Sequence, residues 1–279
     1  MHRYVLSWIG AGAMACCLST TLHAQQQVTL LVPPAEFVPP APPKLSVDCR
    51  ANRIASDVTR RPLRVLSRAL RIKRKIKILA IGSSTTVGVG ASSPTATYVA
   101  NLESTLEGSF KGMDFDVVGR GVSGEVAQGA ADRMKKEIDD TKPDLVVWQV
   151  GTNDAIRHVS IEAFKNCLRT TLAWLAENKL DVVLVDPQYG KVLTADDYYE
   201  RVVKAVADIA KESGVLLVDR FQAMLELQRA RGDTYYLSAD NLHMNDRGHR
   251  CMAEQLARAI VGGLVNTDAD AQQPVLQHP

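Results

Sequence analysis

The sequence predicts an α/β fold, a three-layer α/β/α sandwich around a five-stranded parallel, flavodoxin-like sheet. Short apolar runs alternate with longer amphipathic segments over most of the chain, which is typical of strands joined by helical crossovers. The run Asp144–Val150 is almost entirely apolar, as expected for a strand that is buried on both faces. A length of 279 residues is sufficient for one sizeable core with an extension.

The first 24 residues are expected to be a secretory signal peptide. Arg3 precedes the mostly apolar stretch Tyr4–Leu18, and the following residues end in the small Ala24, where cleavage is expected. The apolar stretch is short for a bilayer span. Ala13–Cys16 faintly resembles a lipid-attachment box, so a lipoprotein is the less favoured alternative. We therefore expect an exported protein, either periplasmic or secreted.

The next two segments are expected to precede the main domain. Residues 25–48 are rich in proline and are predicted to be a linker that builds no core. Residues 49–75 are strongly basic and are predicted to be a helical extension. This extension either touches an anionic envelope surface or lies on the main domain with its leucines inward, and the apolar spacing favours the second interpretation. The net charge of +2 gives no indication of nucleic-acid binding.

The main domain is expected over residues 76–266, with a polar tail at 267–279. Five strands are predicted, at 76–81, 115–118, 144–150, 182–185 and 215–218. Helices are predicted at 95–106, 125–139, 161–178 and 195–213, with a short helix from 221 and a closing helix at 245–261. Right-handed crossovers between parallel strands place such helices on both faces of the sheet.

Three cysteines remain once the signal peptide is removed: Cys49, Cys167 and Cys251. One disulfide with one buried thiol is compatible with an oxidising compartment, and the pairing stays open. Cys167 and Cys251 lie within helical patterns, where at least one of them is expected to be a small core hydrophobe. None of the cysteines has the spacing of a metal site, so no metal and no other cofactor is expected.

The stretch Ile78–Ser92 is the best candidate for carrying chemistry. Its apolar run breaks at Gly82 into small, hydroxylated and glycine residues before a helix. Ligands of open α/β sheets bind outside the carboxyl ends of the strands, so Ser84 is well placed to react. Three further segments fall at strand ends or in the last loop: Gly121–Glu125, Gly151–Asp154 and Asp240–His243.

Together these four segments resemble the four blocks of the SGNH hydrolases, also called the GDSL esterase/lipase family. The resemblance extends from about residue 76 to residue 264. The blocks of that family supply, in order, a serine nucleophile, a glycine, an asparagine and an Asp-x-x-His pair. The resemblance therefore implies a catalytic triad of Ser84, Asp240 and His243. It also implies an oxyanion hole formed by the backbone N–H groups of Ser84 and Gly124 and the side-chain amide of Asn153.

The chemistry of ester cleavage accounts for these residue types. A serine hydroxyl is a poor nucleophile until a base takes its proton, and histidine, with an unperturbed pKa of about 6.5, does so near neutral pH. An aspartate that accepts the other ring N–H stabilises the imidazolium, and fixed donors stabilise the oxyanion. Each residue alone also has an ordinary interpretation, as a helix cap, turn glycine, Asx turn or loop histidine. Their joint occurrence in family order favours catalysis.

The sequence departs from the family pattern at two positions. Ser83 replaces the aspartate of Gly-Asp-Ser, which also makes Ser83 a minor rival for the nucleophile. Gly119 replaces an asparagine often found near the second block. At the exit of the fourth strand, Gln188 and Tyr189 are candidates for lining the acyl or alcohol pocket, with an ordinary strand exit as an equally weighted alternative.

Other types of site find no support in the sequence. Ser93 stands where a dinucleotide fingerprint would need its third glycine, and there is no Gly-Lys-Ser/Thr phosphate loop. Thr86 replaces the last glycine of an α/β-hydrolase elbow. His243 and His249 have no third metal ligand at a convincing spacing.

The sequence thus predicts an exported serine esterase whose substrate is an O-acyl or O-acetyl group on carbohydrate, or a small ester. Two alternatives stay open. The same triad could serve an O-acyltransferase that passes the acyl group to a sugar hydroxyl, or the chain could be a non-catalytic envelope- or glycan-binding protein. No nucleic-acid partner is expected, and the sequence leaves the oligomeric state open.

Overall fold

A computed structural model describes residues 37–50, 61–232 and 235–264, and the statements below concern these residues. The signal peptide predicted at 1–24, the first part of the proline-rich linker and the polar tail at 267–279 lie outside the described residues.

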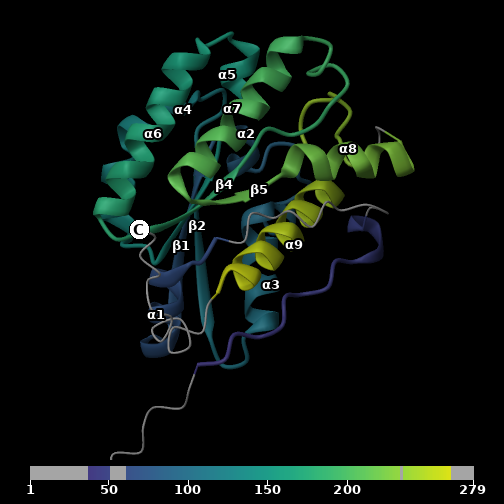
Figure 1. The fold of residues 1–279 in the computed structure, drawn as a ribbon. Helices are drawn as coiled ribbons and strands as arrows, with labels where there is room; N and C mark the ends of the chain where they lie inside the picture. The colour runs from purple at the N-terminus through teal and green to yellow at the C-terminus, as the bar shows by residue number, and fades with distance from the viewer. Residues whose placement is uncertain (1–36, 51–60, 233–234, 265–279) are drawn as a thin grey trace, which may run out of the picture. The chain divides into compact units, whose positions relative to one another are not determined.

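The fold is organised around a five-stranded, all-parallel sheet in the order β2-β1-β3-β4-β5 (Figure 1). This is the flavodoxin-like strand order, so the predicted fold class is confirmed. β3 is buried along its whole length, which explains why its residues are apolar up to the final Gln149. The strands are β1 (Lys75–Gly82), β2 (Asp114–Gly121), β3 (Leu145–Gln149), β4 (Asp181–Val185) and β5 (Leu216–Val218).

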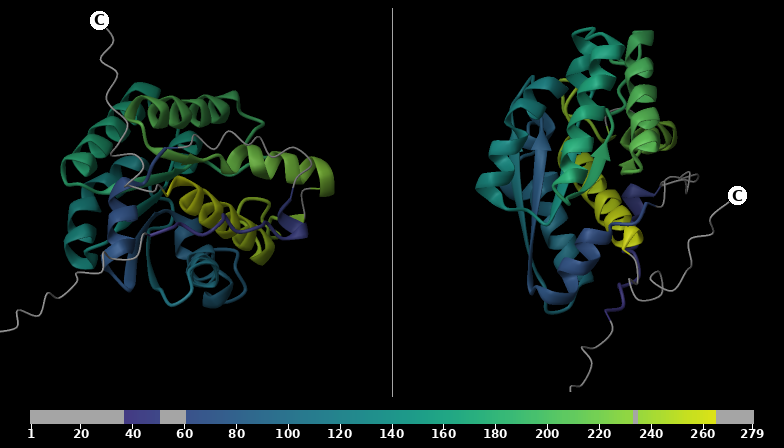
Figure 2. Two further views of the ribbon diagram at one scale, coloured as in Figure 1. Left: turned by 60° about the horizontal axis from the view of Figure 1, so that its bottom comes forward. Right: turned by 60° about the vertical axis from the view of Figure 1, so that its left-hand side comes forward.

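Helices cover both faces of the sheet, as Figures 1 and 2 show. Alternate side chains of β1 supply the two cores, with Ile78 and Ala80 on one face and Leu79 and Ile81 on the other. The first face packs against α1 (Arg64–Ile72), α3 (Tyr98–Ser109) and α9 (Asp246–Gly263). The second packs against α4 (Ala127–Thr141), α6 (Ile161–Glu177) and α7 (Asp197–Ser213).

The remaining elements are short or follow the sheet edge. Helix α8 (Arg220–Arg231) comes directly after β5. Two one-turn helices that the sequence pattern did not predict, α2 (Ser84–Val87) and α5 (Thr152–Ile156), begin just after β1 and β3. Single 3-10 turns lie at η1 (Val47–Cys49) and η2 (Pro94–Ala96). None of the described helices combines the length and the apolar character needed to cross a bilayer.

The basic extension lies on the domain with its leucines inward. Leu63, Leu66 and Leu70 are buried in the core cluster shared with α3 and α9. The Leu66 N–H donates to a carboxylate oxygen of Asp181 at 2.9 Å, which fixes α1 at the amino end of β4. This agrees with the interpretation in which the extension packs on the main domain. A contact of its basic side chains with an envelope surface stays a prediction.

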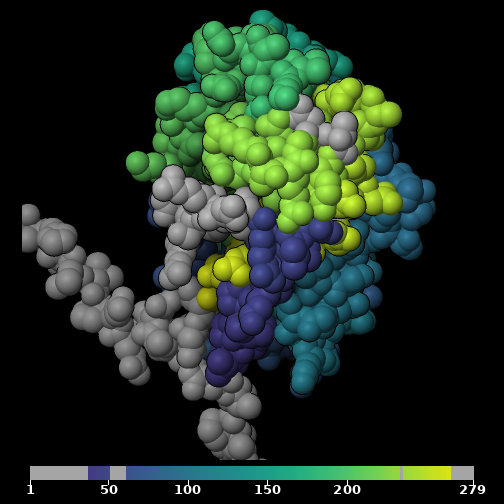
Figure 3. Space-filling model, turned by 90° about the vertical axis from the view of Figure 1, so that its right-hand side faces the viewer, coloured from purple at the N-terminus to yellow at the C-terminus, as the bar shows by residue number. Residues whose placement is uncertain are grey.

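The expectation that residues 25–48 build no core is wrong from Phe37 onward. Figure 3 shows residues 37–50 lying against α8 and α9. Cys49 forms a disulfide with Cys251 of α9, and Leu45 is buried in the same cluster. The Ser46 N–H donates to Glu254 at 2.7 Å. A proline-rich segment cannot build a core of its own, but it can lie extended on a preformed surface when specific contacts hold it there.

The disulfide also settles the cysteine pairing that the sequence left open. Cys49 and Cys251 are 202 residues apart in the chain. Cys167 is the buried free thiol and packs among the hydrophobic residues of the second core. The expectation that at least one of the two helical cysteines is a core hydrophobe therefore applies to Cys167.

Candidate active site

The site begins where β1 ends, because the chain turns at Gly82 directly into α2. A Cβ atom on Gly82 would lie 2.6 Å from the Thr86 hydroxyl and 2.8 Å from the Gln149 carbonyl oxygen, so glycine is required here. Ser84 is the first residue of α2. Its backbone N–H therefore has no acceptor within the helix and is free to bind a ligand.

The two neighbouring serine hydroxyls have different surroundings. Ser83 is only 5% exposed, and both its N–H and its hydroxyl donate to Oε1 of Gln149, at 3.1 and 3.2 Å. The half-buried Ser84 places its Oγ 3.0 Å from Nε2 of His243. Ser83 therefore holds the turn, and Ser84 is the serine that faces the histidine. Gln149, which the sequence analysis did not single out, ties this turn to the end of β3.

The loop before α9 brings Asp240 against His243. Nδ1 of His243 lies 2.6 Å from Oδ2 of Asp240, while Oδ1 of Asp240 accepts the N–H groups of Leu242 and His243, each at 2.9 Å. The hydroxyl of Ser238 donates to the same oxygen at 2.8 Å. Burial alone would raise the pKa of Asp240, but these hydrogen bonds, with His243 foremost, hold it well below its usual range. Asp240 is therefore ionised at neutral pH and accepts the Nδ1–H of His243.

The side chain of Gln188 is buried and forms hydrogen bonds to this loop, so the expectation that it lines the substrate pocket is wrong. It is 2% exposed, its Nε2 donates to the Leu242 carbonyl at 3.0 Å, and its Oε1 accepts from the Thr152 hydroxyl at 3.3 Å. A buried amide must be paired, and both ends of this one are used inside the protein. Tyr189 is half-buried with its ring edge-on to Phe221, at 5.5 Å between ring centres. A pocket role for Tyr189 stays a prediction.

Gly124 and Asn153 follow β2 and β3, the two strands that flank β1 in the sheet. Gly124 has φ +76°, a left-handed conformation that favours glycine. Asn153 donates from Nδ2 to the Glu125 carbonyl at 2.9 Å. An amide nitrogen carries two hydrogens, so the second one stays available. Within 37–50, 61–232 and 235–264, the N–H groups of Ser84 and Gly124 donate to no acceptor.

Asp154 joins the loop of Gly124 to the turn of Asn153. This carboxylate is 1% exposed, and its two oxygens accept the N–H of Ala127, the first residue of α4, at 3.0 and 3.1 Å. Burial raises the pKa of Asp154 to about 6, although its backbone hydrogen bonds act in the opposite direction. The sequence analysis missed this role. The only available signal was the position of Asp154 at the start of a short helix after β3.

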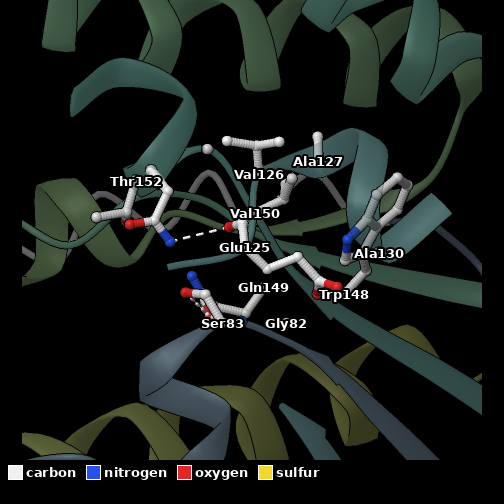
Figure 4. Close-up of a pocket in the computed structure, with 12 residues that line it drawn as sticks. Gly82, Ser83, Glu125, Val126, Ala127, Ala130, Trp148, Gln149, Val150 and Thr152 are labelled. Atoms are coloured by element: carbon white, nitrogen blue, oxygen red, sulfur yellow. Dashed lines mark hydrogen bonds between the residues drawn. The ribbon is translucent and has the colours of Figure 1, made fainter. Parts of the chain in front are cut away.

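A small cavity lies beside this turn (Figure 4). The residues that line it include Gly82, Ser83, Trp148, Gln149 and Asn153. Trp148 is fully buried, and its indole N–H donates to no acceptor in the part of the chain that the structure describes. The cavity has room for one water molecule or a similarly small group.

Comparison with known families agrees with this geometry. The model of the non-GDSL lipase-like family matches residues 48–266, which is most of the chain. The chain belongs to this family. Together with the fold, the match confirms the resemblance to the SGNH/GDSL hydrolases and makes this non-GDSL lipase-like protein a carboxylic ester hydrolase.

This chain aligns with several known proteins over most of their length. An acetylxylan esterase from Geobacillus stearothermophilus is 28% identical over 211 residues, which are 66% of this chain and 93% of that protein. An arylesterase from Vibrio mimicus is 25% identical over 193 residues, or 66% of this chain and 88% of that protein. The crystal structure of a lipase/acylhydrolase from Enterococcus faecalis has a TM-score of 0.58 at 25% identity, covering 68% of this chain and 98% of that one.

Proposed function

We propose that this non-GDSL lipase-like protein is an exported serine esterase that removes an acetyl or other small acyl group from carbohydrate. Its nucleophile is Ser84, its base is His243, and Asp240 orients the base. The observation that supports this proposal best is one continuous chain of hydrogen bonds. It runs from Asp240 Oδ2 to His243 Nδ1 at 2.6 Å, and from His243 Nε2 to Ser84 Oγ at 3.0 Å.

In the first half of the reaction, Ser84 Oγ attacks the ester carbonyl while its proton passes to Nε2 of His243. The carbonyl oxygen becomes an oxyanion and accepts hydrogen bonds from the N–H groups of Ser84 and Gly124 and from the second amide hydrogen of Asn153. When the tetrahedral intermediate collapses, His243 gives its proton to the departing alcohol oxygen. The acyl group is left on Ser84 as an ester.

In the second half, a water molecule attacks the acyl-enzyme and His243 Nε2 takes its proton. The same donors stabilise the second oxyanion, and collapse returns the proton to Ser84 Oγ as the free acid leaves. Asp240 stays ionised throughout and stabilises the imidazolium formed in each half. Asp154 and Gln149 touch no reacting atom. They hold the donor loops and the nucleophile turn in place.

A similar protein supports a small acyl group on carbohydrate. The acetylxylan esterase is 28% identical to this chain over 211 residues, which are 93% of that protein. Acetyl is therefore the acyl group that we propose.

Export is part of the proposal. The Cys49–Cys251 disulfide supports it, because disulfides persist in oxidising compartments outside the cytosol. The predicted cleavage after Ala24 gives a direct test by N-terminal sequencing of the protein recovered from periplasm or medium. A mature chain that begins at Gln25 agrees with the proposal. An intact N-terminus on protein confined to the cytosol contradicts it.

The esterase proposal is tested by hydrolysis of p-nitrophenyl acetate and butyrate. We expect Ser84→Ala to lower kcat by a factor on the order of 10⁴–10⁶ with the fold intact, because the nucleophile is lost while little packing changes. Ser83→Ala is the matched control and should keep most activity, since the Ser83 N–H still donates to Gln149. An acetate preference supports a small acyl group. No hydrolysis by the folded wild type refutes the esterase, and transfer to a sugar acceptor or glycan binding is then tested.

A further inference from the structure

Arg157 lies beside the proposed oxyanion hole. It directly follows α5, four residues after Asn153, and its N–H donates to the Asn153 carbonyl at 3.0 Å. Residues four apart on a helical turn share a face. The side chain of Arg157 therefore extends on the same side of α5 as the amide that is proposed to bind the oxyanion.

The guanidinium also lies against Gly124. A Cβ atom on Gly124 would be 3.2 Å from Nη2 of Arg157. Because Gly124 has no side chain, the positively charged guanidinium of Arg157 can lie next to the Gly124 peptide. Two of the three proposed oxyanion donors, Gly124 and Asn153, therefore have Arg157 as a neighbour.

Glu125 and His158, on either side of Arg157, each have a close side-chain partner, whereas the Arg157 guanidinium makes no ion pair within 4.0 Å in the described residues. Glu125 is paired with Arg133 at 2.7 Å, and His158 with Asp196 at 2.6 Å. In the described ranges, no carboxylate lies within 4.0 Å of the exposed Arg157 guanidinium, and it makes no side-chain hydrogen bond. The guanidinium interacts electrostatically with the buried Asp154, whose two oxygens already accept the N–H of Ala127.

We propose that Arg157 forms a carboxylate-binding subsite at the rim of the active site, and that the substrate is an O-acylated acidic carbohydrate. A guanidinium presents two parallel N–H donors that match a carboxylate. This inference rests on the proposed esterase function. Because the acyl group is small and has no carboxylate, the anion belongs to the alcohol part, as in a sugar chain that contains uronic acid.

The test compares two acetyl esters that differ in charge on the alcohol part, 4-acetoxybenzoate and 4-acetoxybenzamide. The ratio of their kcat/KM values is measured for wild type, Arg157→Gln and Arg157→Lys. We expect Arg157→Gln to lower the ratio of anionic to neutral ester about two- to fivefold, the range of a solvent-exposed ion pair. Arg157→Lys keeps the charge and should keep much of the ratio.

The control variant is Arg68→Gln, which removes the same charge from α1, the helix at the amino end of β4. Its ratio should equal that of the wild type. Added salt should lower the wild-type ratio towards that of Arg157→Gln, because salt screens exposed charges. An unchanged ratio in an active Arg157→Gln enzyme overturns the subsite and leaves the esterase standing. A wild type inactive on both esters refutes the proposed function itself.

Discussion

Replacing Gly90 with alanine is expected to lower kcat/KM about a hundredfold in a protein that still folds. Gly90 has φ +92°, and a Cβ atom there would lie 2.2 Å from the Met244 carbonyl oxygen and 3.0 Å from the His243 Cβ. Cβ contacts essentially never fall below 3.0 Å, so the two segments must part by about 0.8 Å. The N–H and the hydroxyl of Ser92 each donate to Asp246 at 2.6 Å, which holds the Gly90 segment in place. Part of the displacement must therefore be taken up by His243.

The expected loss follows from the sensitivity of catalysis to position, since a misplacement of about 1 Å costs about 10²-fold. The left-handed backbone adds about 1–2 kcal/mol of strain to the folded state. Hydrolysis of p-nitrophenyl acetate measures the activity, and circular dichroism and thermal unfolding check the fold. Gly108→Ala is the matched control, because a Cβ atom there would have no neighbour within 4 Å apart from the adjoining backbone of its own helix. A folded Gly90→Ala enzyme with wild-type kcat/KM would refute the argument.

Two further predictions concern stability. Burial raises the pKa of Asp154 from 3.8 to about 6. Between these two pH values the folded protein keeps a proton on Asp154 that the unfolded protein has lost, so the free energy of unfolding falls as the pH rises. Compared with Asp154→Asn, the wild type should lose about 2 kcal/mol of unfolding free energy between pH 4 and pH 7, measured with urea, and parallel pH profiles would contradict this. Reducing the disulfide, or replacing Cys49 and Cys251 with serine, should cost about 2–5 kcal/mol because the bond closes a long loop. Reductant should not affect the double variant, and a wild type equally stable in reductant would count against the prediction.

The strand and helix pattern was predictable from the sequence because it depends on local properties. Continuous apolar runs indicate strands buried on both faces, and β3 is buried throughout. The short helices α2 and α5 were not predicted, since one turn is too short to show a period. The docking of residues 37–50 was also missed. It depends on α8 and α9, which lie about 200 residues further along the chain.

The candidate site was predictable in its members but not in their surroundings. The order of the four segments named Ser84, Gly124, Asn153, Asp240 and His243, and their places at strand ends put them at one edge of the sheet. No local pattern distinguishes a residue that meets the substrate from one that supports the loop beneath it. Gln188 was therefore mistaken for a pocket residue, although its amide is buried beneath Leu242.

The fold class, the family and the set of candidate catalytic residues could be predicted from the sequence, because these depend on periodicity and on the order of short motifs. Three features became known only from the folded chain: which of two adjacent serines faces His243, which cysteines pair, and which cation lies beside Gly124. Each of these is a contact between segments far apart in the chain, or between strand ends and loops that only the sheet brings together. Side-chain direction at such contacts is set by packing and hydrogen-bond pairing, which a linear pattern does not contain.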